Sequence, residues 1–113
     1  MKKLSEQSCS ACQPNSTLLA QDEIKELLLH LEGWQVVTEN NTQKLTRIFN
    51  TKKYANSMSF TNRIAELAET INHHPLLIVE YASVTVVWWS HEIKGLHKTD
   101  FIMAAKTDTL FTL

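Results

Sequence analysis

Hydrophobic residues recur with a helical period in three parts of the chain. The first stripe consists of Ile24, Leu27, Leu28 and Leu31. It predicts a helix that begins near Gln21 and ends before Gly33, a residue typical of helix C-termini. The same spacing predicts a second helix over residues 53–71, which Pro75 prevents from continuing. A third helix is predicted over residues 98–109, where the apolar stripe is the least distinct of the three.

Short β-prone segments lie between these helices in two pairs. The predicted strands are Trp34–Thr38, Gln43–Phe49, Leu76–Tyr81 and Val84–Ser90. The polar run Glu39–Thr42 predicts a hairpin turn in the first pair, and Ala82-Ser83 is the short connection in the second. The order α-β-β-α-β-β-α is typical of an α+β fold, with a four-stranded antiparallel sheet and three helices packed on one face. The open edges of such a sheet favour pairing with another copy, so we expect a homo-oligomer.

Length and composition limit the function classes. The 113 residues suffice for one domain, which we place at residues 18–113 behind a polar, flexible lead-in at 1–17. Eleven Lys and Arg against twelve Asp and Glu give a net charge of −1 without a basic stripe, which argues against a nucleic-acid partner. The apolar runs are too short to span a membrane. Polar residues follow the first lysines where a signal peptide would be apolar, so we expect a cytoplasmic protein.

Histidine is the most informative residue type for chemistry. His30 lies beside an apolar helical stripe and is expected to be an ordinary surface residue. His73 and His74 precede Pro75 at the junction between the second helix and the third strand, and His91 follows the fourth strand. If the second pair of strands forms a hairpin, these three histidines converge at one end of the sheet.

Such a group of imidazoles allows three interpretations. Rings with a pKa near 6.5 suit general acid–base catalysis, three histidines can also bind zinc with one position open, and histidines can simply stabilise a helix end. The residues alone leave all three open. Cys9 and Cys12 form a C-x-x-C that suggests a redox pair or half a zinc site, although an inert polar tail suits its context better. Trp88 and Trp89 are expected to face opposite sides of a strand, one of them in the core or an interface.

One set of spacings is far more specific than these features. It consists of Glu69, His73-His74-Pro75, Tyr81, His91 and Asp100. At these positions the chain closely resembles the pterin-4a-carbinolamine dehydratases, and the run 84–105 resembles their bacterial branch. The likeness covers roughly residues 9–110.

The resemblance implies both a fold and a reaction. Members of this family are α+β proteins with a four-stranded antiparallel sheet and three helices, assembled as homodimers or homotetramers. They dehydrate 4a-hydroxytetrahydropterin, a product of aromatic amino-acid hydroxylases such as phenylalanine hydroxylase, to quinonoid dihydropterin. They use no metal and no organic cofactor. Animal members also serve as dimerisation cofactors of a transcription factor, so a non-catalytic co-regulator module is the alternative function.

The resemblance also assigns roles by position. His73, His74 and His91 match the catalytic histidines, with His74 and His91 as the expected principal pair. Residues that match the lining of the pterin site are Asn72, His73, His74, Trp89, Ser90, His91 and Glu92. Glu69 and Asp100 match positions expected to support the histidines. His97 stands where animal members carry a Ser that would cap the last helix, and Asn72 stands where many of them carry Asp.

Overall fold

Two hairpins and three helices make up the described part of the chain. The computed structural model describes Ser5 and residues 18–111. Its elements are α1 (Gln21–Leu28), β1 (Gln35–Glu39), β2 (Thr42–Asn50), α2 (Tyr54–Ile71), β3 (Leu76–Val79), β4 (Ser83–Trp88) and α3 (Lys98–Leu110). This order confirms the predicted α-β-β-α-β-β-α arrangement. Cys9, Cys12 and the predicted lead-in, except Ser5, lie outside the described residues.

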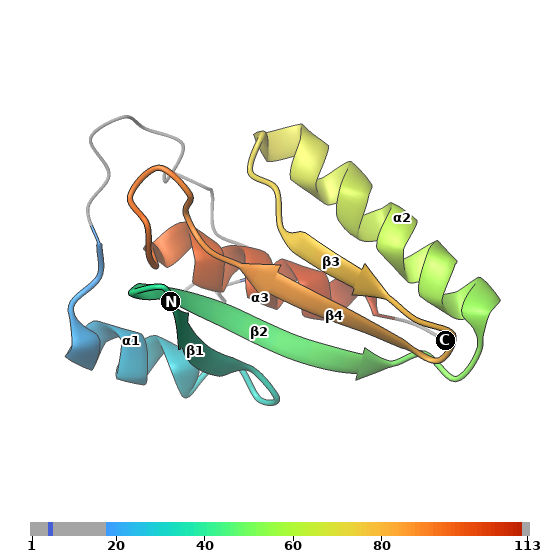
Figure 1. Ribbon diagram of the computed structural model, residues 1–113, viewed down its shortest axis with the longest axis horizontal. Coiled ribbons are helices and arrows are strands. Elements are labelled where there is room, and N and C mark those ends of the chain that lie inside the picture. The colour runs from blue at the N-terminus through green and yellow to red at the C-terminus, as the bar shows by residue number, and fades with distance from the viewer. Residues whose placement is uncertain (1–4, 6–17, 112–113) are drawn as a thin grey trace.

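The sheet has the strand order β1-β2-β4-β3, and all its neighbours are antiparallel. Its centre is the pairing of β2 with β4, which joins the two hairpins (Figure 1). β1 and β3 are therefore the edge strands. In the second hairpin Leu76 pairs with Val87, which places the start of β3 beside the end of β4.

The two hairpin turns differ in how well the sequence predicts them. Asn40 and Asn41 adopt left-handed φ angles of 50° and 62°, as a two-residue hairpin turn requires, so the first turn lies where predicted. The second connection is longer than the predicted Ala82-Ser83, and both of its strands, Leu76–Val79 and Ser83–Trp88, are shorter than predicted. The N–H of Glu80 donates to the carbonyl of Ser83 at 2.8 Å, so residues 80–82 form the turn and β4 begins at Ser83.

The predicted end of the first helix is also wrong. α1 ends at Leu28 rather than just before Gly33. The N–H groups of His30 and Leu31 donate to carbonyls three residues back, a tighter turn than an α-helix. This turn still buries Leu31, and it brings Trp34 into the core ahead of β1. The exposed His30 is the surface residue that the sequence predicts.

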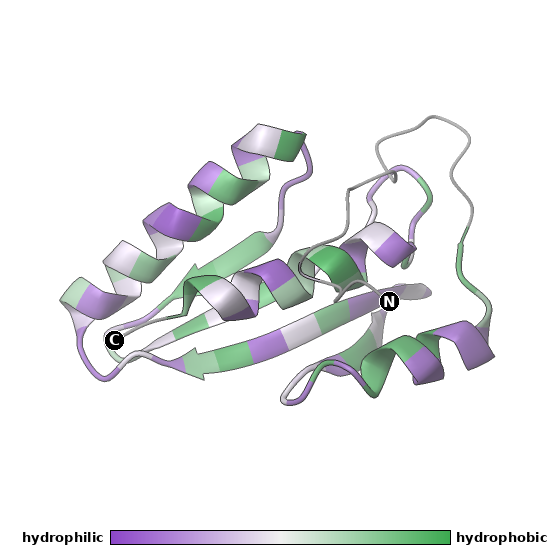
Figure 2. Cartoon of the chain, turned by 180° about the vertical axis from the view of Figure 1, so that it is seen from behind, coloured by the Kyte–Doolittle hydropathy of each residue, from purple (hydrophilic) through white to green (hydrophobic). Residues whose placement is uncertain are grey.

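The helices bury one face of the sheet. Fully buried inner-face residues of β2 and β4 are Leu45, Phe49, Val84, Val86 and Trp88. Ile24 of α1, Phe60 and Ile64 of α2, and Phe101 and Met103 of α3 join the same core. Figure 2 shows hydrophobic and hydrophilic residues alternating along α2, which has one buried side. α3 is different, because its buried residues run from Thr99 to Ala104 without a break, which explains its indistinct stripe.

None of the helices in the described residues covers the other face of the sheet. Ile48, Leu76 and Ile78 project from it with 68%, 45% and 48% of their surface exposed. Within the described residues, no helix is both long and apolar enough to cross a membrane.

Candidate active site

The end of α2 sets the position of the paired histidines. Asn72 ends the helix in the left-handed conformation, with φ at 54°, and its N–H donates to the carbonyl of Ala68. His73 donates to the same carbonyl at 3.3 Å. Pro75 follows two residues later and cannot continue a helix. This sharp turn fixes where His73 and His74 leave the backbone.

Substitutions at Asn72 test how much this turn depends on its left-handed residue. Asn and Gly tolerate positive φ, whereas a Cβ-branched or Ala side chain does so at a cost of about 1 kcal/mol. We expect Asn72→Ala to lower the free energy of unfolding by about that amount and Asn72→Gly to change it by less. Urea denaturation measures both. Equal stability of the two variants would contradict the role given to the φ angle.

A buried carboxylate gathers the surrounding polar groups. Asp100 of α3 has no exposed surface. Its Oδ1 lies 2.7 Å from Nε2 of His73, and its Oδ2 accepts from Oγ of Ser90 at 2.8 Å and from N–H of His97 at 3.0 Å. We call these four residues the Asp100 hub. An ionised carboxylate can only accept, so in the contact with Asp100 the Nε2–H of His73 is the donor. In the neutral tautomer that carries this Nε2–H, Nδ1 is the acceptor of the ring.

Trp88 forms one wall of the hub. The His73 ring stacks on the Trp88 indole with centroids 5.6 Å apart and planes 20° apart. The indole Nε1–H donates to Oγ1 of Thr107 at 3.1 Å, which fixes the wall to α3. Trp88 is fully buried and Trp89 only partly, in agreement with the predicted core position for one of the two.

His97 caps α3 at its N-terminus. Its Nδ1 accepts the N–H of Thr99 at 3.2 Å, while Asp100 accepts the N–H of His97. Burial lowers the pKa of His97, an effect that outweighs the nearby Asp100 carboxylate, which raises this pKa, and His73 lowers it further. A helix cap therefore exists where the sequence places an imidazole instead of the expected Ser.

The other two catalytic candidates reach the solvent. Nε2 of His74 lies 2.5 Å from Oε2 of Glu69, and the two side chains are 52% and 76% exposed. His91 is exposed and packs on the Trp89 ring at 4.2 Å between centroids. The ammonium of Lys44, from β2, lies 4.2 Å from the centroid on the Trp89 ring. Both histidines are thus accessible to a dissolved molecule.

The structure brings the predicted site residues to one end of the sheet. Because β3 begins beside the end of β4, the segments 72–74 and 89–92 lie at the same end (Figure 1). Direct hydrogen bonds join His73 and Ser90 to Asp100, whereas His74 pairs with Glu69 and His91 with Trp89. Asn72 and Glu92 are exposed.

The sequence assigned no role in the site to three residues of this region: Lys44, Trp88 and His97. The pairing of Leu45 with Trp88 places Lys44 near Trp89, and only the register between the hairpins gives that information. Among Ser5 and residues 18–111, no three His, Cys, Asp or Glu side chains are grouped so that they could hold a metal ion.

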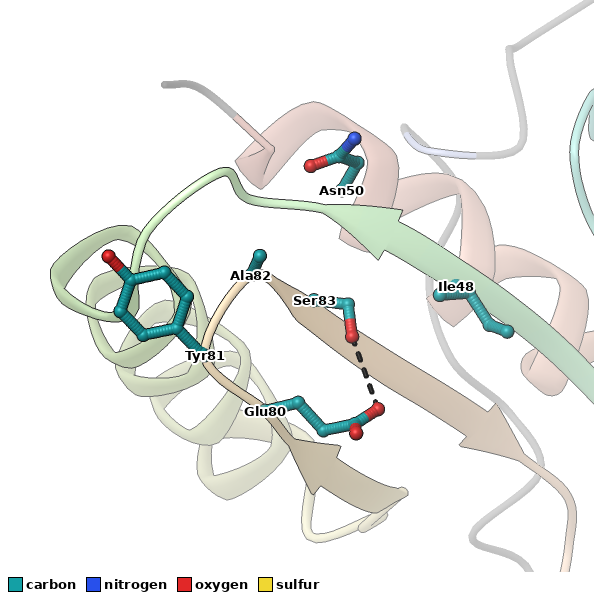
Figure 3. A pocket seen from close by; sticks show the side chains of 6 residues that line it. All are labelled: Ile48, Asn50, Glu80, Tyr81, Ala82 and Ser83. Carbon is teal, nitrogen blue, oxygen red and sulfur yellow. Dashed lines mark hydrogen bonds between the residues drawn. The ribbon is translucent and has the colours of Figure 1, made fainter.

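A separate hollow of about 510 Å³ lies at the opposite end of the sheet. It is lined by Ile48, Asn50, Glu80, Tyr81, Ala82 and Ser83, as Figure 3 shows. The turn between β3 and β4 forms one side, with Ser83 donating to Glu80 at 3.3 Å. Since Ser83 begins β4 and Trp88 ends it, this hollow and the Asp100 hub are at opposite ends of that strand.

Comparison with known sequences points to one family. Residues 17–110 match the family model described as pterin 4 alpha carbinolamine dehydratase. The chain is 47% identical over 110 residues to a protein of Nitrosococcus oceani, with 97% of both chains covered. It is 44% identical over 110 residues to a protein of Syntrophotalea carbinolica, covering 97% of this chain and 98% of the relative. Both relatives are provisionally named pterin-4-alpha-carbinolamine dehydratases.

Solved structures give the same result for the fold. A transcriptional coactivator/pterin dehydratase from Brucella melitensis superposes with a TM-score of 0.77 at 31% identity, covering 83% of this chain and 98% of that one. A pterin dehydratase-like RuBisCO assembly factor of the alpha-carboxysome has a TM-score of 0.59 at 20% identity, covering 70% of this chain and 89% of that one. The second likeness concerns the fold alone.

Proposed function

The chain belongs to the pterin 4 alpha carbinolamine dehydratase family, and from this we propose that it converts 4a-hydroxytetrahydropterin to quinonoid dihydropterin and water. The observation that carries this proposal is that the three histidines differ in exposure and in hydrogen bonding. His73 is held by the buried Asp100, while His74 and His91 are exposed at the same end of the sheet. One immobilised ring and two accessible rings suit a site that positions a flat molecule and moves protons on it.

The reaction requires two proton transfers. The C4a–O bond breaks while an acid gives a proton to the departing hydroxyl, which leaves as water. A base removes the proton on N5, and the N5–H electrons form the new double bond to C4a. We propose that His74 and His91 take these roles, one as the acid and the other as the base, and each transfer contributes about 10²–10⁴-fold. Proton transfer alone needs neither a metal nor an organic cofactor.

Supporting groups act on these rings through contacts already described. Glu69 accepts from His74, which holds that ring in one orientation, and Asp100 does the same for His73. We propose that His73 positions the substrate, and that backbone groups of residues 72–74 and 89–92 form hydrogen bonds with the edge of the pterin. The fused ring of Trp89, packed on His91, offers a flat apolar surface beside it. The substrate would come from an aromatic amino-acid hydroxylase in the cytoplasm.

The decisive test is a coupled assay with phenylalanine hydroxylase and a synthetic tetrahydropterin. We expect the purified protein to accelerate the loss of the 4a-carbinolamine above its spontaneous rate, because the spontaneous reaction lacks a positioned acid and base. Absorbance of quinonoid dihydropterin measures this step. Dehydration at the spontaneous rate with correctly folded protein would rule the proposal out.

A second candidate function is a non-catalytic co-regulator module. Two observations favour it: the Brucella melitensis structure carries the name transcriptional coactivator/pterin dehydratase, and Ile48, Leu76 and Ile78 give the open sheet face an apolar character. The free edge of β3 also supports the homo-oligomer expected from the sequence. Binding of a regulator that His91→Ala leaves intact, in protein without dehydratase activity, would favour this function.

A further inference from the structure

The cap of α3 connects the partly buried imidazole of His97 to the fully buried carboxylate of Asp100. Two side chain–backbone hydrogen bonds form this cap. Nδ1 of His97 accepts the N–H of Thr99, and Oδ2 of Asp100 accepts the N–H of His97. We propose that His97 is a positioning residue, which through this cap holds the Asp100 carboxylate in line with Nε2 of His73. The proposal rests on the proposed function only in giving His73 a part in the reaction.

The geometry explains why Asp100 needs such support. Its two oxygens have different hydrogen-bond partners: Oδ1 contacts His73, and Oδ2 accepts from both Ser90 and His97. A rotation of the first turn of α3 would lengthen the 2.7 Å contact to His73, because the carboxylate moves with the helix. The cap fixes that turn, because Nδ1 of His97 accepts the N–H of Thr99 and Oδ2 of Asp100 accepts the N–H of His97. His97 thus acts on His73 through Asp100.

An imidazole cap differs from a Ser, Asn or Asp cap in one chemical respect. Nδ1 accepts the N–H of Thr99 only while it carries no proton, so the ring must be neutral. A protonated ring would lose this acceptor and place a positive charge at the positive end of the helix. The cap of α3 in this chain is therefore sensitive to pH, whereas a hydroxyl or amide cap is not.

Burial and the neighbouring charged groups determine the pH range over which the cap is lost. The ionisable groups that act on His97 are Asp100 on α3 and His73 on the α2–β3 connection, and Ser90 contributes a neutral hydroxyl to the same carboxylate. Burial and His73 lower the pKa of His97 below its ordinary 6.5, against the opposing effect of Asp100. The unfolded chain then binds the proton more readily than the folded one. The stabilisation by the cap is complete above about pH 6.5 and is lost as the pH falls below that value.

The test follows the nitrogen resonances of His73 in protein with ¹⁵N-labelled histidine at pH 7.5. We expect His97→Ala to weaken the Nε2–H signature of His73 and lower kcat roughly tenfold, with little change in KM. His97→Asn restores a side-chain acceptor at the cap, so we expect it to recover both the His73 signature and kcat. His30→Ala removes an exposed histidine from the turn after α1, outside the hub, and is the matched control.

A second arm uses pH. As the pH falls from 7.5 to below 6.5, we expect the His73 signature of the wild-type protein to weaken together with the protonation of His97, and to persist to lower pH in His97→Asn. This arm needs no His97→Ala protein, so it decides the proposal even if that variant does not fold. An unchanged His73 signature in His97→Ala, or the same loss in His97→Asn, would overturn it. Because the nitrogen resonances are read without substrate, this result is independent of whether the protein proves to be a dehydratase.

Discussion

Removal of either accessible histidine is expected to abolish most of the catalysis. We expect His74→Ala and His91→Ala each to lower kcat/KM by about 10²-fold or more, because each takes away one of the two proton transfers. Combining them should cost little more than either one alone, since an acid and a base that act in one step do not contribute independently. The coupled pterin assay measures all three variants after subtraction of the spontaneous rate.

The fold should survive these changes. His74 and His91 are exposed, and replacing an exposed side chain usually alters the free energy of unfolding by no more than about 0.5 kcal/mol. His30→Ala, a third exposed histidine, should keep full activity and so controls for the loss of an imidazole in general. Wild-type turnover in both His74→Ala and His91→Ala would show that the catalytic groups lie elsewhere.

Changing the hub carboxylate to an amide should alter both stability and catalysis. In Asp100→Asn one oxygen can still accept from Ser90 and His97, but the amide NH₂ then faces Nε2 of His73. Two donors cannot face each other, so we expect His73 to move its proton from Nε2 to Nδ1. The ring would then lack the acceptor that the wild-type tautomer presents to the substrate. We expect kcat to fall at least tenfold and the free energy of unfolding to fall by about 1–3 kcal/mol.

A second carboxylate on the same helix provides the comparison. Asp108 accepts from Trp34 Nε1 and pairs with Arg47 at 2.9 Å, and burial raises its pKa in spite of these partners. Asp108→Asn should therefore affect stability without changing the His73 tautomer. The imidazole ¹⁵N shifts and urea denaturation measure both variants. If Asp100→Asn kept the wild-type tautomer, Asp100 could not be the group that determines it.

The fold was predictable because strand and helix periodicities differ so clearly here. The first hairpin turn was predicted within the run Glu39–Thr42, and its strands differ from the predicted ones by one residue at each end; Asn40 and Asn41 tolerate the left-handed angles that this turn requires. The end of α1 could not be placed, because Leu31 continues the helical spacing but is buried through a tighter turn after Leu28. The hydrophobic pattern of a sequence shows which residues are buried, but it does not distinguish an α-helix from the tighter turn that follows Leu28.

The site was predictable to the extent that its residues lie at the ends of elements. A helix end at Asn72 and the hairpin of β3 and β4 are enough to bring His73, Ser90 and His91 to one end of the sheet. The sequence does not predict the cap that His97 forms, because propensity favours Ser over an imidazole at that position. The contact of Lys44 with Trp89 depends on the β2–β4 register, which no local pattern encodes.

The chain separation of the hub partners has a consequence for folding. His73 and Asp100 are 27 residues apart, and Ser90 and Asp100 only 10, so the hub closes short loops within the second half of the chain. The centre of the sheet, by contrast, pairs β2 with β4 across α2 and β3, and so joins the first hairpin to the second. Short loops cost less chain entropy than long ones. The hub can therefore form with the second hairpin, and its assembly does not have to wait for the first hairpin to dock.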